Sequence, residues 1–382
     1  MTVRLYNFRT ASGESRELFY TASAGTSRII DKADISDEPR AVNCGGRLLL
    51  PAFTDVGCEF FDPEFPQRDT LRTASASASA GGYRRLLTLD ERAVKDNDIR
   101  VKNALPLPTD PEKIEVGGIY FMKHGGAYAL KELFSAAKRA DALIISAGID
   151  EKTVKGSYAD GIASKMTGEG GISRYEECGE LAKELFAAYE SGCRFHVRAI
   201  ASAEALQMIR EAKASGASVT AGVSPFHLSM TGNDVAFYGS ACKLLPPLRS
   251  VKDREALREG LFDGSIDCVS SLHTPRTRQE KDRGAFGLCS FETVLPALMT
   301  YMPELHREAP QRLEGVLSAF PSALIGEEFE LKVGQSADFV LVDTESETVI
   351  TENTLKTKSL NTMLMGQTVL SSLRLYLNGT EA

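Results

Sequence analysis

The sequence lacks the features that mark a membrane-spanning or secreted protein. Tryptophan is absent, and no apolar run approaches the roughly 18 residues that a membrane span requires. No charged segment followed by an apolar stretch opens the chain, so we expect no signal peptide. The seven cysteines are an odd number and form no C-x-x-C pair, which argues against a disulfide framework. We therefore expect a cytoplasmic protein that does not bind a membrane.

Basic residues are too few for a nucleic-acid-binding surface. The 44 lysines and arginines are outnumbered by 52 acidic residues. A surface that neutralises phosphates is basic as a rule, so we expect no nucleic-acid partner. What the chain does have is 382 residues, of which 43% are hydrophobic and 25% charged. These values are typical of a globular protein, and the length fits two to three domains or one large barrel with an appendage.

Both ends of the chain have the pattern of short β-strands. Apolar and polar residues alternate in runs bounded by Gly, Asp and Ser, which favours antiparallel strands. These runs are 3–6, 17–21, 27–30 and 47–50 near the start, and 339–342, 348–350 and 373–377 near the end. We expect the two ends to pair into one composite β-domain, formed by residues 1–50 and 326–382.

The middle of the chain alternates strands with helices. We expect one helix over Ala203–Ala214, with Ser202 as its N-cap, and another over Val251–Phe262, with Ser250 as its N-cap. The strands expected around them are 142–146, 195–200, 218–223 and 265–271. Repeated βα units predict a parallel sheet covered on both faces, and about 270 residues is the size of a (β/α)₈ barrel. We therefore assign residues 51–325 to an α/β barrel.

Several segments resemble, in sequence and in order, the dihydroorotase branch of the amidohydrolase superfamily. They are Pro51–Asp55, Ala80–Tyr83, Ala212–Ala221, Leu244–Arg249, Asp253–Asp267, Phe286–Thr293 and Gly334–Phe339. The resemblance spans nearly the whole chain and implies a distorted (β/α)₈ TIM barrel with a small β-sandwich formed by both termini. It also implies metal-assisted chemistry of pyrimidine biosynthesis, in which a binuclear zinc site activates a hydroxide that attacks a cyclic amide.

The positions that carry this chemistry in the family hold different residues here. According to the resemblance, one group supplies imidazoles, a bridging carboxylate and a proton-shuttling aspartate, and in this chain it consists of Gly57, Glu59, Lys123, His124, Ser146, Ala199 and Leu272. A second group binds the substrate, and here it is Phe61, Glu91, Leu245 and Arg276. A zinc pair without three or more neutral imidazoles or thiolates falls outside ordinary ligand sets. We therefore expect no metal, no other cofactor and no intact catalytic or substrate residue.

The replacements differ in charge in a way that predicts new ion pairs. Lys123, His124 and Arg276 are added cations, and Glu59 and Glu91 are added acids. Because an unpaired buried charge is costly, we predict that Glu59 pairs with Lys123 or His124. By the same reasoning Glu91 is predicted to pair with Arg276. Close packing further predicts that the vacated cavity is filled by Phe61, Leu245 and Leu272.

Three functional hypotheses follow. The first is an inactive dihydroorotase homologue that serves as a structural or regulatory partner, as a homodimer or with aspartate carbamoyltransferase or an active dihydroorotase paralogue. The second is a metal-free hydrolase of cyclic amides, with Glu59 and Glu91 as acid and base and Lys123 as electrophile or nucleophile. The third is a genuine dihydroorotase with an unusual metal site made from Cys58, Glu59 and His124, although neighbours on a strand point to opposite faces. We favour the first, because fold and function are separable.

Overall fold

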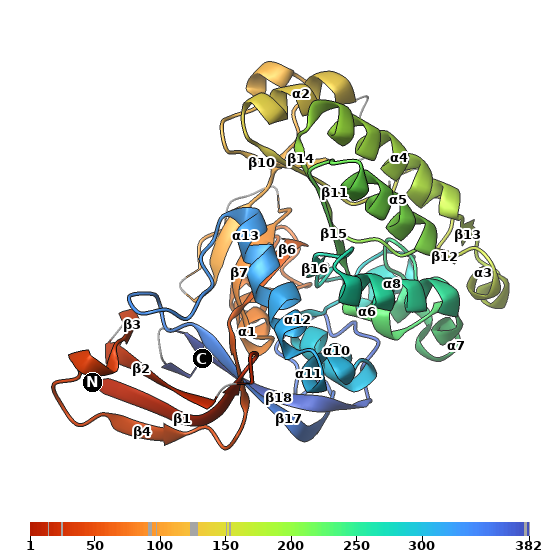
Figure 1. Cartoon of the computed structure of the whole chain (residues 1–382). Helices are drawn as coiled ribbons and strands as arrows, with labels where there is room; N and C mark the ends of the chain where they lie inside the picture. The colour runs from red at the N-terminus through yellow and green to blue at the C-terminus, as the bar shows by residue number, and fades with distance from the viewer. Residues whose placement is uncertain are drawn as a thin grey trace.

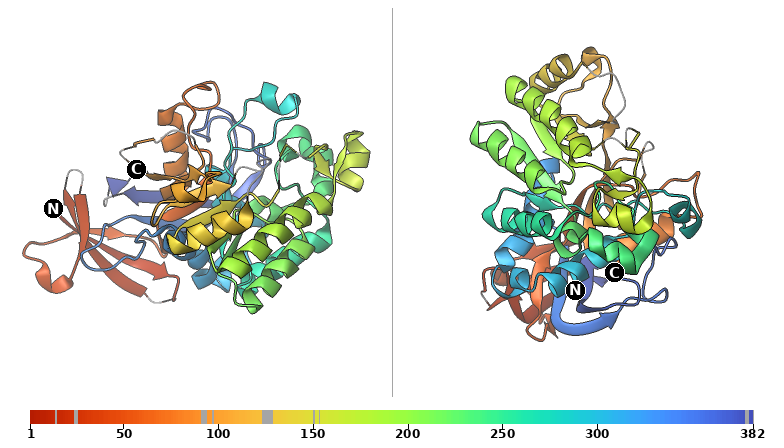
Figure 2. Two further views of the ribbon diagram at one scale, coloured as in Figure 1. Left: turned by 90° about the horizontal axis from the view of Figure 1, so that it is seen from above. Right: turned by 90° about the vertical axis from the view of Figure 1, so that its right-hand side faces the viewer.

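Parallel strands surrounded by helices form the larger part of the molecule, and a mixed sheet lies to one side of them (Figure 1). The computed structural model describes residues 1–13, 15–23, 26–90, 94–96, 98–122, 129–149, 151–152, 154–377 and 380–381. Figure 2 shows the mixed sheet standing beside the barrel in the view from above. The architecture is the expected α/β class, a distorted (β/α)₈ barrel with an added β-structure.

The mixed sheet joins the two ends of the chain through β5. Leu50 of β5 lies opposite Val340 of β17 in antiparallel register, while the other edge of β5 pairs in parallel with β1. Arg84 on the barrel strand β7 forms a buried ion pair of 3.0 Å with Asp338, which precedes β17, and so attaches this sheet to the barrel. The strands are β1 (Thr2–Thr10), β2 (Ser15–Ser23), β3 (Thr26–Ile30), β4 (Arg40–Asn43), β5 (Leu48–Pro51), β17 (Phe339–Val349), β18 (Thr368–Leu377) and β19 (Thr380–Glu381). The domain limits at residues 50 and 326 remain a prediction.

Two runs of parallel strands form the barrel wall. One run is β6 (Phe53–Cys58), β7 (Tyr83–Thr88) and β8 (Arg100–Asn103). The other, in spatial order, is β16 (Cys268–Val269), β15 (Val219–Val223), β14 (Arg194–Val197), β11 (Leu143–Ser146), β10 (Ile119–Met122) and β9 (Leu105–Pro106). The main-chain N–H of Glu59 donates to the carbonyl oxygen of His273 over 2.8 Å. This bond ties the end of β6 to the segment after β16, so the first and last strands of the wall lie together.

Helices cover the outer side of the strands, and their starts follow the expected caps (Figure 1). The side chain of Ser202 accepts a hydrogen bond from the N–H of Ala205, and α5 covers the expected residues. The side chain of Ser250 caps α8 in the same way. Among the described residues, no helix is both long and apolar enough to cross a bilayer. The helices are α1 (Leu71–Ala80), α2 (Leu130–Arg139), α3 (Ile162–Thr167), α4 (Arg174–Ser191), α5 (Ala203–Ala214), α6 (Pro225–Ser229), α7 (Val235–Tyr238), α8 (Val251–Asp263), α9 (Arg278–Asp282), α10 (Val294–Tyr301), α11 (Glu304–Arg307), α12 (Pro310–Glu314) and α13 (Phe320–Ile325).

The expected strand at 265–271 is shorter in the structure, where only Cys268–Val269 pairs as β16. The two serines that follow β16 also bond to β6. Ser270 donates through its hydroxyl to the carbonyl oxygen of Val56 over 3.2 Å, and Ser271 donates to the carboxylate of Asp55. The N–H of Ser270 still donates to the carbonyl oxygen of Val223 on β15 over 3.0 Å, so this segment is bonded to both neighbouring strands. A separate pair of short strands, β12 (Tyr158–Ala159) and β13 (Gly171–Ile172), lies next to α3.

Candidate functional site

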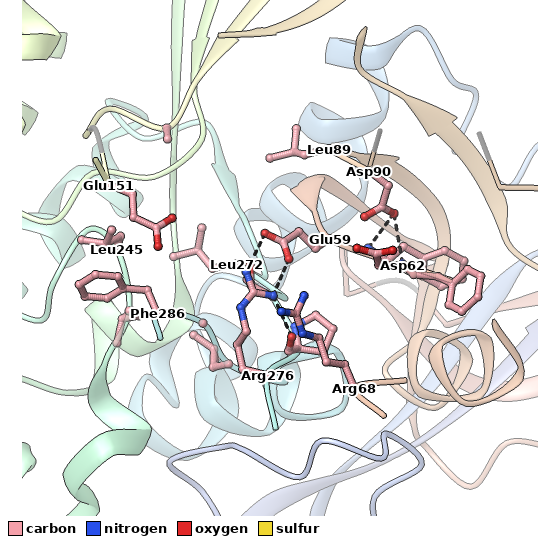
Figure 3. A pocket seen from close by; sticks show the side chains of 18 of the residues that line it. Glu59, Asp62, Arg68, Leu89, Asp90, Glu151, Leu245, Leu272, Arg276 and Phe286 are labelled. Carbon is pink, nitrogen blue, oxygen red and sulfur yellow. Dashed lines mark hydrogen bonds and ion pairs between the residues drawn. The ribbon is translucent and has the colours of Figure 1, made fainter. Parts of the chain in front are cut away.

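A cavity of about 660 Å³ opens at the carboxyl ends of the barrel strands. This is the end of a (β/α)₈ barrel at which binding and catalytic residues gather. Figure 3 shows how acidic, basic and apolar side chains share its walls. Its charged lining residues are Glu59, Asp62, Glu64, Asp69, Asp90, Glu151, Arg68, Lys152, Arg198 and Arg276, and its apolar ones include Phe60, Phe61, Leu89, Phe121, Ile149, Leu244, Leu245, Leu272, Phe286 and Leu288.

Gly57 lies in an irregular part of β6 where only glycine fits. Its φ is +89°, a backbone conformation that other residues rarely adopt. The pairing of β6 with β7 shifts register at this point, between Val56 and Cys58. A Cβ atom on Gly57 would lie 2.7 Å from Cδ and 2.9 Å from Cγ of Arg198. Any larger residue at position 57 would therefore have to displace the Arg198 side chain.

Arg198, which directly follows β14, is a fixed cation at the floor of this cavity. One of its terminal nitrogens donates to the carbonyl oxygen of Gly57 over 3.2 Å. Its Nε atom is buried and has no hydrogen-bond partner among the described residues. Burial lowers the pKa of Arg198, whereas the nearby carboxylates of Glu59 and Asp55 raise it in part. A guanidinium remains protonated under these conditions, so the positive charge stays in the barrel mouth.

Asp55 and Cys58 lie below the cavity in the barrel interior. Asp55 is fully buried and accepts two hydrogen bonds of 2.7 Å from Ser271, one from its N–H and one from its hydroxyl. Burial raises the pKa of the Asp55 carboxyl. Cys58 is also fully buried, and burial raises the pKa of its thiol well above the ordinary value. Because metals bind the thiolate rather than the thiol, Cys58 is a poor ligand here.

Glu59 and Arg276 form the main ion pair of the mouth (Figure 3). The two terminal nitrogens of Arg276 lie 2.7 and 3.3 Å from the carboxylate oxygens of Glu59. Burial works against the charge of Arg276, but Glu59 raises its pKa above the ordinary value. The sequence did not predict this pairing; it gave Arg276 to Glu91, which lies outside the described residues. The bond from Glu59 N–H to His273 explains it, because closing the barrel brings the end of β6 next to Arg276.

Three other residues of the sequence-based prediction cannot be placed. Lys123, His124 and Glu91 lie outside the described residues. The predicted pairing of Glu59 with Lys123 or His124 therefore stays a prediction, while the structure shows Glu59 paired with Arg276.

The prediction that Phe61, Leu245 and Leu272 fill the cavity is wrong, because all three line an open space. Phe61 packs against the apolar core of the barrel, and Leu272 packs with a second buried cluster. Both side chains therefore form part of the wall and leave the interior of the cavity open.

Ser146 and Ala199 do not line the cavity. Ser146 is buried, donates to Glu184 over 2.9 Å and accepts from the N–H of Gly148 over 2.9 Å. Burial raises the pKa of Glu184 to about 8. Ala199 is buried in an apolar cluster. Of the described sequence-predicted positions, the structure brings Glu59, Phe61, Leu245, Leu272 and Arg276 together around the cavity.

Asp90 is a cavity residue that was not singled out in the sequence. One of its carboxylate oxygens accepts hydrogen bonds from the N–H groups of Phe60 and Phe61, at 3.0 and 3.1 Å. Burial, together with the neighbouring carboxylates of Glu59 and Asp62, raises the pKa of Asp90 to about 7, although those two bonds lower it in part. Arg198 and Glu151 were missed as well. A single arginine within the mainly apolar stretch Phe195–Ile200 was the available signal for Arg198.

The described donor set does not fit a zinc pair. Among the residues that the structure describes, no three His, Cys, Asp or Glu side chains gather closely enough to hold a metal ion. His196 and His273 are fully buried, and burial lowers the pKa of each to about 3. His196 bonds to Thr220 at 2.9 Å, and His273 stacks on Phe291. Both imidazoles thus have packing partners in the core.

The backbone at Leu272 generates a testable prediction. Its φ is +53°, a left-handed conformation that costs a residue such as Leu about 1 kcal/mol but that Asn adopts readily. Leu272→Asn should therefore destabilise the protein by about 1 kcal/mol less than Leu244→Asn, since Leu244 is equally buried without a positive φ. Urea unfolding of both variants measures the difference. An equal or larger loss for Leu272→Asn would contradict the assignment of strain.

Asp90→Asn tests the raised pKa of the buried carboxyl. With a pKa of about 7 against an ordinary 3.8, folded Asp90 holds a proton that the unfolded chain has already lost in this range. The free energy of unfolding should therefore fall as pH rises from 3.8 to about 7, by at most about 1.4 kcal/mol per pH unit from this group. Urea unfolding across this window should show a weaker fall for Asp90→Asn than for the parent or the exposed control Glu190→Gln. Identical pH dependence in all three proteins would refute the shift.

Comparison with known proteins places the chain in a family. No family model matches it. It is 30% identical to the dihydroorotase of Bacillus subtilis, with 93% of this chain and 91% of that protein aligned. It is 31% identical to the dihydroorotase of Anoxybacillus flavithermus, over 88% and 86%.

Solved structures agree on the fold. The L-hydantoinase (dihydropyrimidinase) of Arthrobacter aurescens superposes with a TM-score of 0.81 at 21% identity, covering 99% of this chain and 95% of that one. The D-hydantoinase (dihydropyrimidinase) of a Thermus species gives 0.83 at 16% identity, covering 100% and 95%. The solved structures thus share the fold of this chain. By its sequence identity to these two dihydroorotases, the chain belongs to the dihydroorotase family of amidohydrolases.

Proposed function

We propose that this chain is a dihydroorotase homologue without a metal centre, catalytically inactive, and a structural or regulatory partner of aspartate carbamoyltransferase. The observation that carries the proposal is the Arg198 side chain packed over Gly57. It occupies the space into which a side chain at position 57 would extend, and the resemblance puts a zinc-binding imidazole there. The positive charge of this guanidinium also repels a pair of divalent cations.

The remaining groups of the mouth support inactivity. Opening a cyclic amide needs an activated water and a group that carries the proton to the leaving nitrogen. Leu272, where the resemblance puts the proton-shuttling aspartate, has no ionisable group. The carboxylate of Glu59 is engaged in an ion pair of 2.7 Å with Arg276. The ion pair of Glu59 and the apolar side chain of Leu272 thus leave neither position free to activate water or to carry a proton.

The partner role is supported by the surface. Ile162 and Met166 on α3 and Phe237 on α7 are exposed, Phe237 by 82%, and α3 contacts α7. Neighbouring exposed apolar side chains mark interaction surfaces in soluble proteins. A barrel can keep such a surface after its site is lost, because the fold does not depend on the chemistry.

A metal-free hydrolase is the second candidate, and Asp90 favours it. A carboxyl with a pKa of about 7 suits general acid–base catalysis near neutral pH. In that case hydrolysis of a cyclic amide would occur without zinc and would be lost in Asp90→Asn.

Metal content and activity together test the inactive assignment. After incubation with zinc and gel filtration, the purified chain is expected to hold well under one zinc per molecule by plasma mass spectrometry. It is also expected to hydrolyse dihydroorotate no faster than buffer, while an active dihydroorotase assayed alongside shows turnover. Stoichiometric zinc together with activity that a chelator removes would overturn the proposal, and zinc-free activity lost in Asp90→Asn would favour the second candidate.

Co-expression with the aspartate carbamoyltransferase of the same organism tests the partner role. The two chains should elute as one complex in size-exclusion chromatography with light scattering. Phe237→Ser should weaken the complex, because it removes an apolar side chain from the α3–α7 surface. Val116→Ser, equally exposed but outside that surface, should not. Separate elution of the two chains at all concentrations would contradict the proposal.

A further inference from the structure

The cavity of the barrel mouth is suited to hold a small molecule. Its volume of about 660 Å³ lies within the range of small-molecule sites, which combine apolar walls with a few placed polar groups. Leu245, Leu272 and Phe286 form an apolar wall, and Figure 3 shows them on the side of the cavity nearer Glu151. The inactive assignment leaves open what occupies this space.

Arg198 is the group whose bonding capacity is least used. A guanidinium carries five N–H donors, yet the structure gives Arg198 one side-chain hydrogen bond, to the carbonyl oxygen of Gly57. No carboxylate among the described residues forms an ion pair with it, and its buried Nε has no partner there. By contrast, Arg276 is paired with Glu59 and Arg68 with Glu280. A carboxylate is the ligand group that a planar guanidinium binds best, through two parallel hydrogen bonds.

The charge balance of the walls excludes a simple anion as the preferred ligand. Six acidic residues line the cavity against four basic ones. Glu151 accepts no hydrogen bond from any residue that the structure describes, and its carboxylate points into the cavity (Figure 3). Glu151 is also close enough to raise the pKa of Arg198 and of Arg276. Arg198 and Glu151 thus lie near each other beside the apolar wall, and neither forms an ion pair with a residue that the structure describes.

We propose that the barrel mouth binds a small zwitterion, an apolar α-amino acid. Its carboxylate would pair with Arg198, its ammonium group with Glu151, and its side chain would pack against Leu245, Leu272 and Phe286. This inference rests on the proposed function, because it requires that no metal centre occupies the mouth. Binding would involve no covalent step and would make the scaffold responsive to a metabolite.

Titration calorimetry on the whole chain tests the proposal with three related probes. L-phenylalanine carries both charges, 3-phenylpropionate carries only the carboxylate, and 2-phenylethylamine carries only the ammonium group. L-phenylalanine is expected to bind at least about tenfold more tightly than either single-charge probe, a difference of about 1.4 kcal/mol. A single-charge probe or dihydroorotate that binds as tightly, or no binding of L-phenylalanine at millimolar concentration, would overturn the inference.

Matched variants assign the two charges. Arg198→Met keeps the aliphatic chain over Gly57 and should reduce the affinity for L-phenylalanine to that for 2-phenylethylamine. Glu151→Gln, at an exposed position, should reduce it to that for 3-phenylpropionate, and Glu190→Gln on the outer surface should change nothing. Unchanged affinity in a folded Glu151→Gln protein would overturn the inference even if Arg198→Met fails to fold.

The measurement of zinc content distinguishes failure of this inference from failure of the proposed function. A zinc-free chain that binds no L-phenylalanine overturns this inference alone. A chain that holds zinc overturns the proposed function, whatever else it binds.

Discussion

The packing of Arg198 over Gly57 is the contact on which the barrel mouth depends. A positive φ at Gly57 and the closeness of the Arg198 side chain both require glycine at that position. The guanidinium in turn gives the floor of the cavity a permanent positive charge, which offsets the fields of Asp55 and Glu59. Without it, the buried carboxyl of Asp55 would lose a nearby positive charge, and an unpaired buried charge is costly.

Around this contact the main-chain geometry fits the family's site, whereas the side chains that face the cavity do not. Leu272 keeps a left-handed conformation in which Asp and Asn are far more common than Leu. Ser271 and the N–H of Glu59 fasten the segment after β16 to β6. The loop geometry of the mouth is therefore maintained by main-chain and buried serine bonds. These bonds do not involve the side chains that face the cavity. The loop geometry can therefore persist when those side chains change and the catalytic activity is lost.

Much of the fold could be predicted from local sequence, but the details of the site could not. The limits of α5 follow from Ser202 and from helical periodicity, which are local signals. The partner of Arg276 depends on barrel closure and lies 217 residues away in sequence. Arg198 gains its importance from Gly57, which is 141 residues earlier. Long-range contacts of this kind leave no periodic pattern, so the pairing of Arg276 with Glu59 was not predicted and Arg198 was not singled out.

The sheet that joins both ends of the chain bears on the order in which the protein acquires its structure during synthesis. β5 emerges from the ribosome before the barrel, and its partner β17 emerges after it. In that interval one edge of β5 lacks a partner, and open strand edges invite pairing with other chains. β17 thus protects the edge of β5, so a polypeptide halted before residue 339 would expose this unpaired edge next to an already assembled barrel.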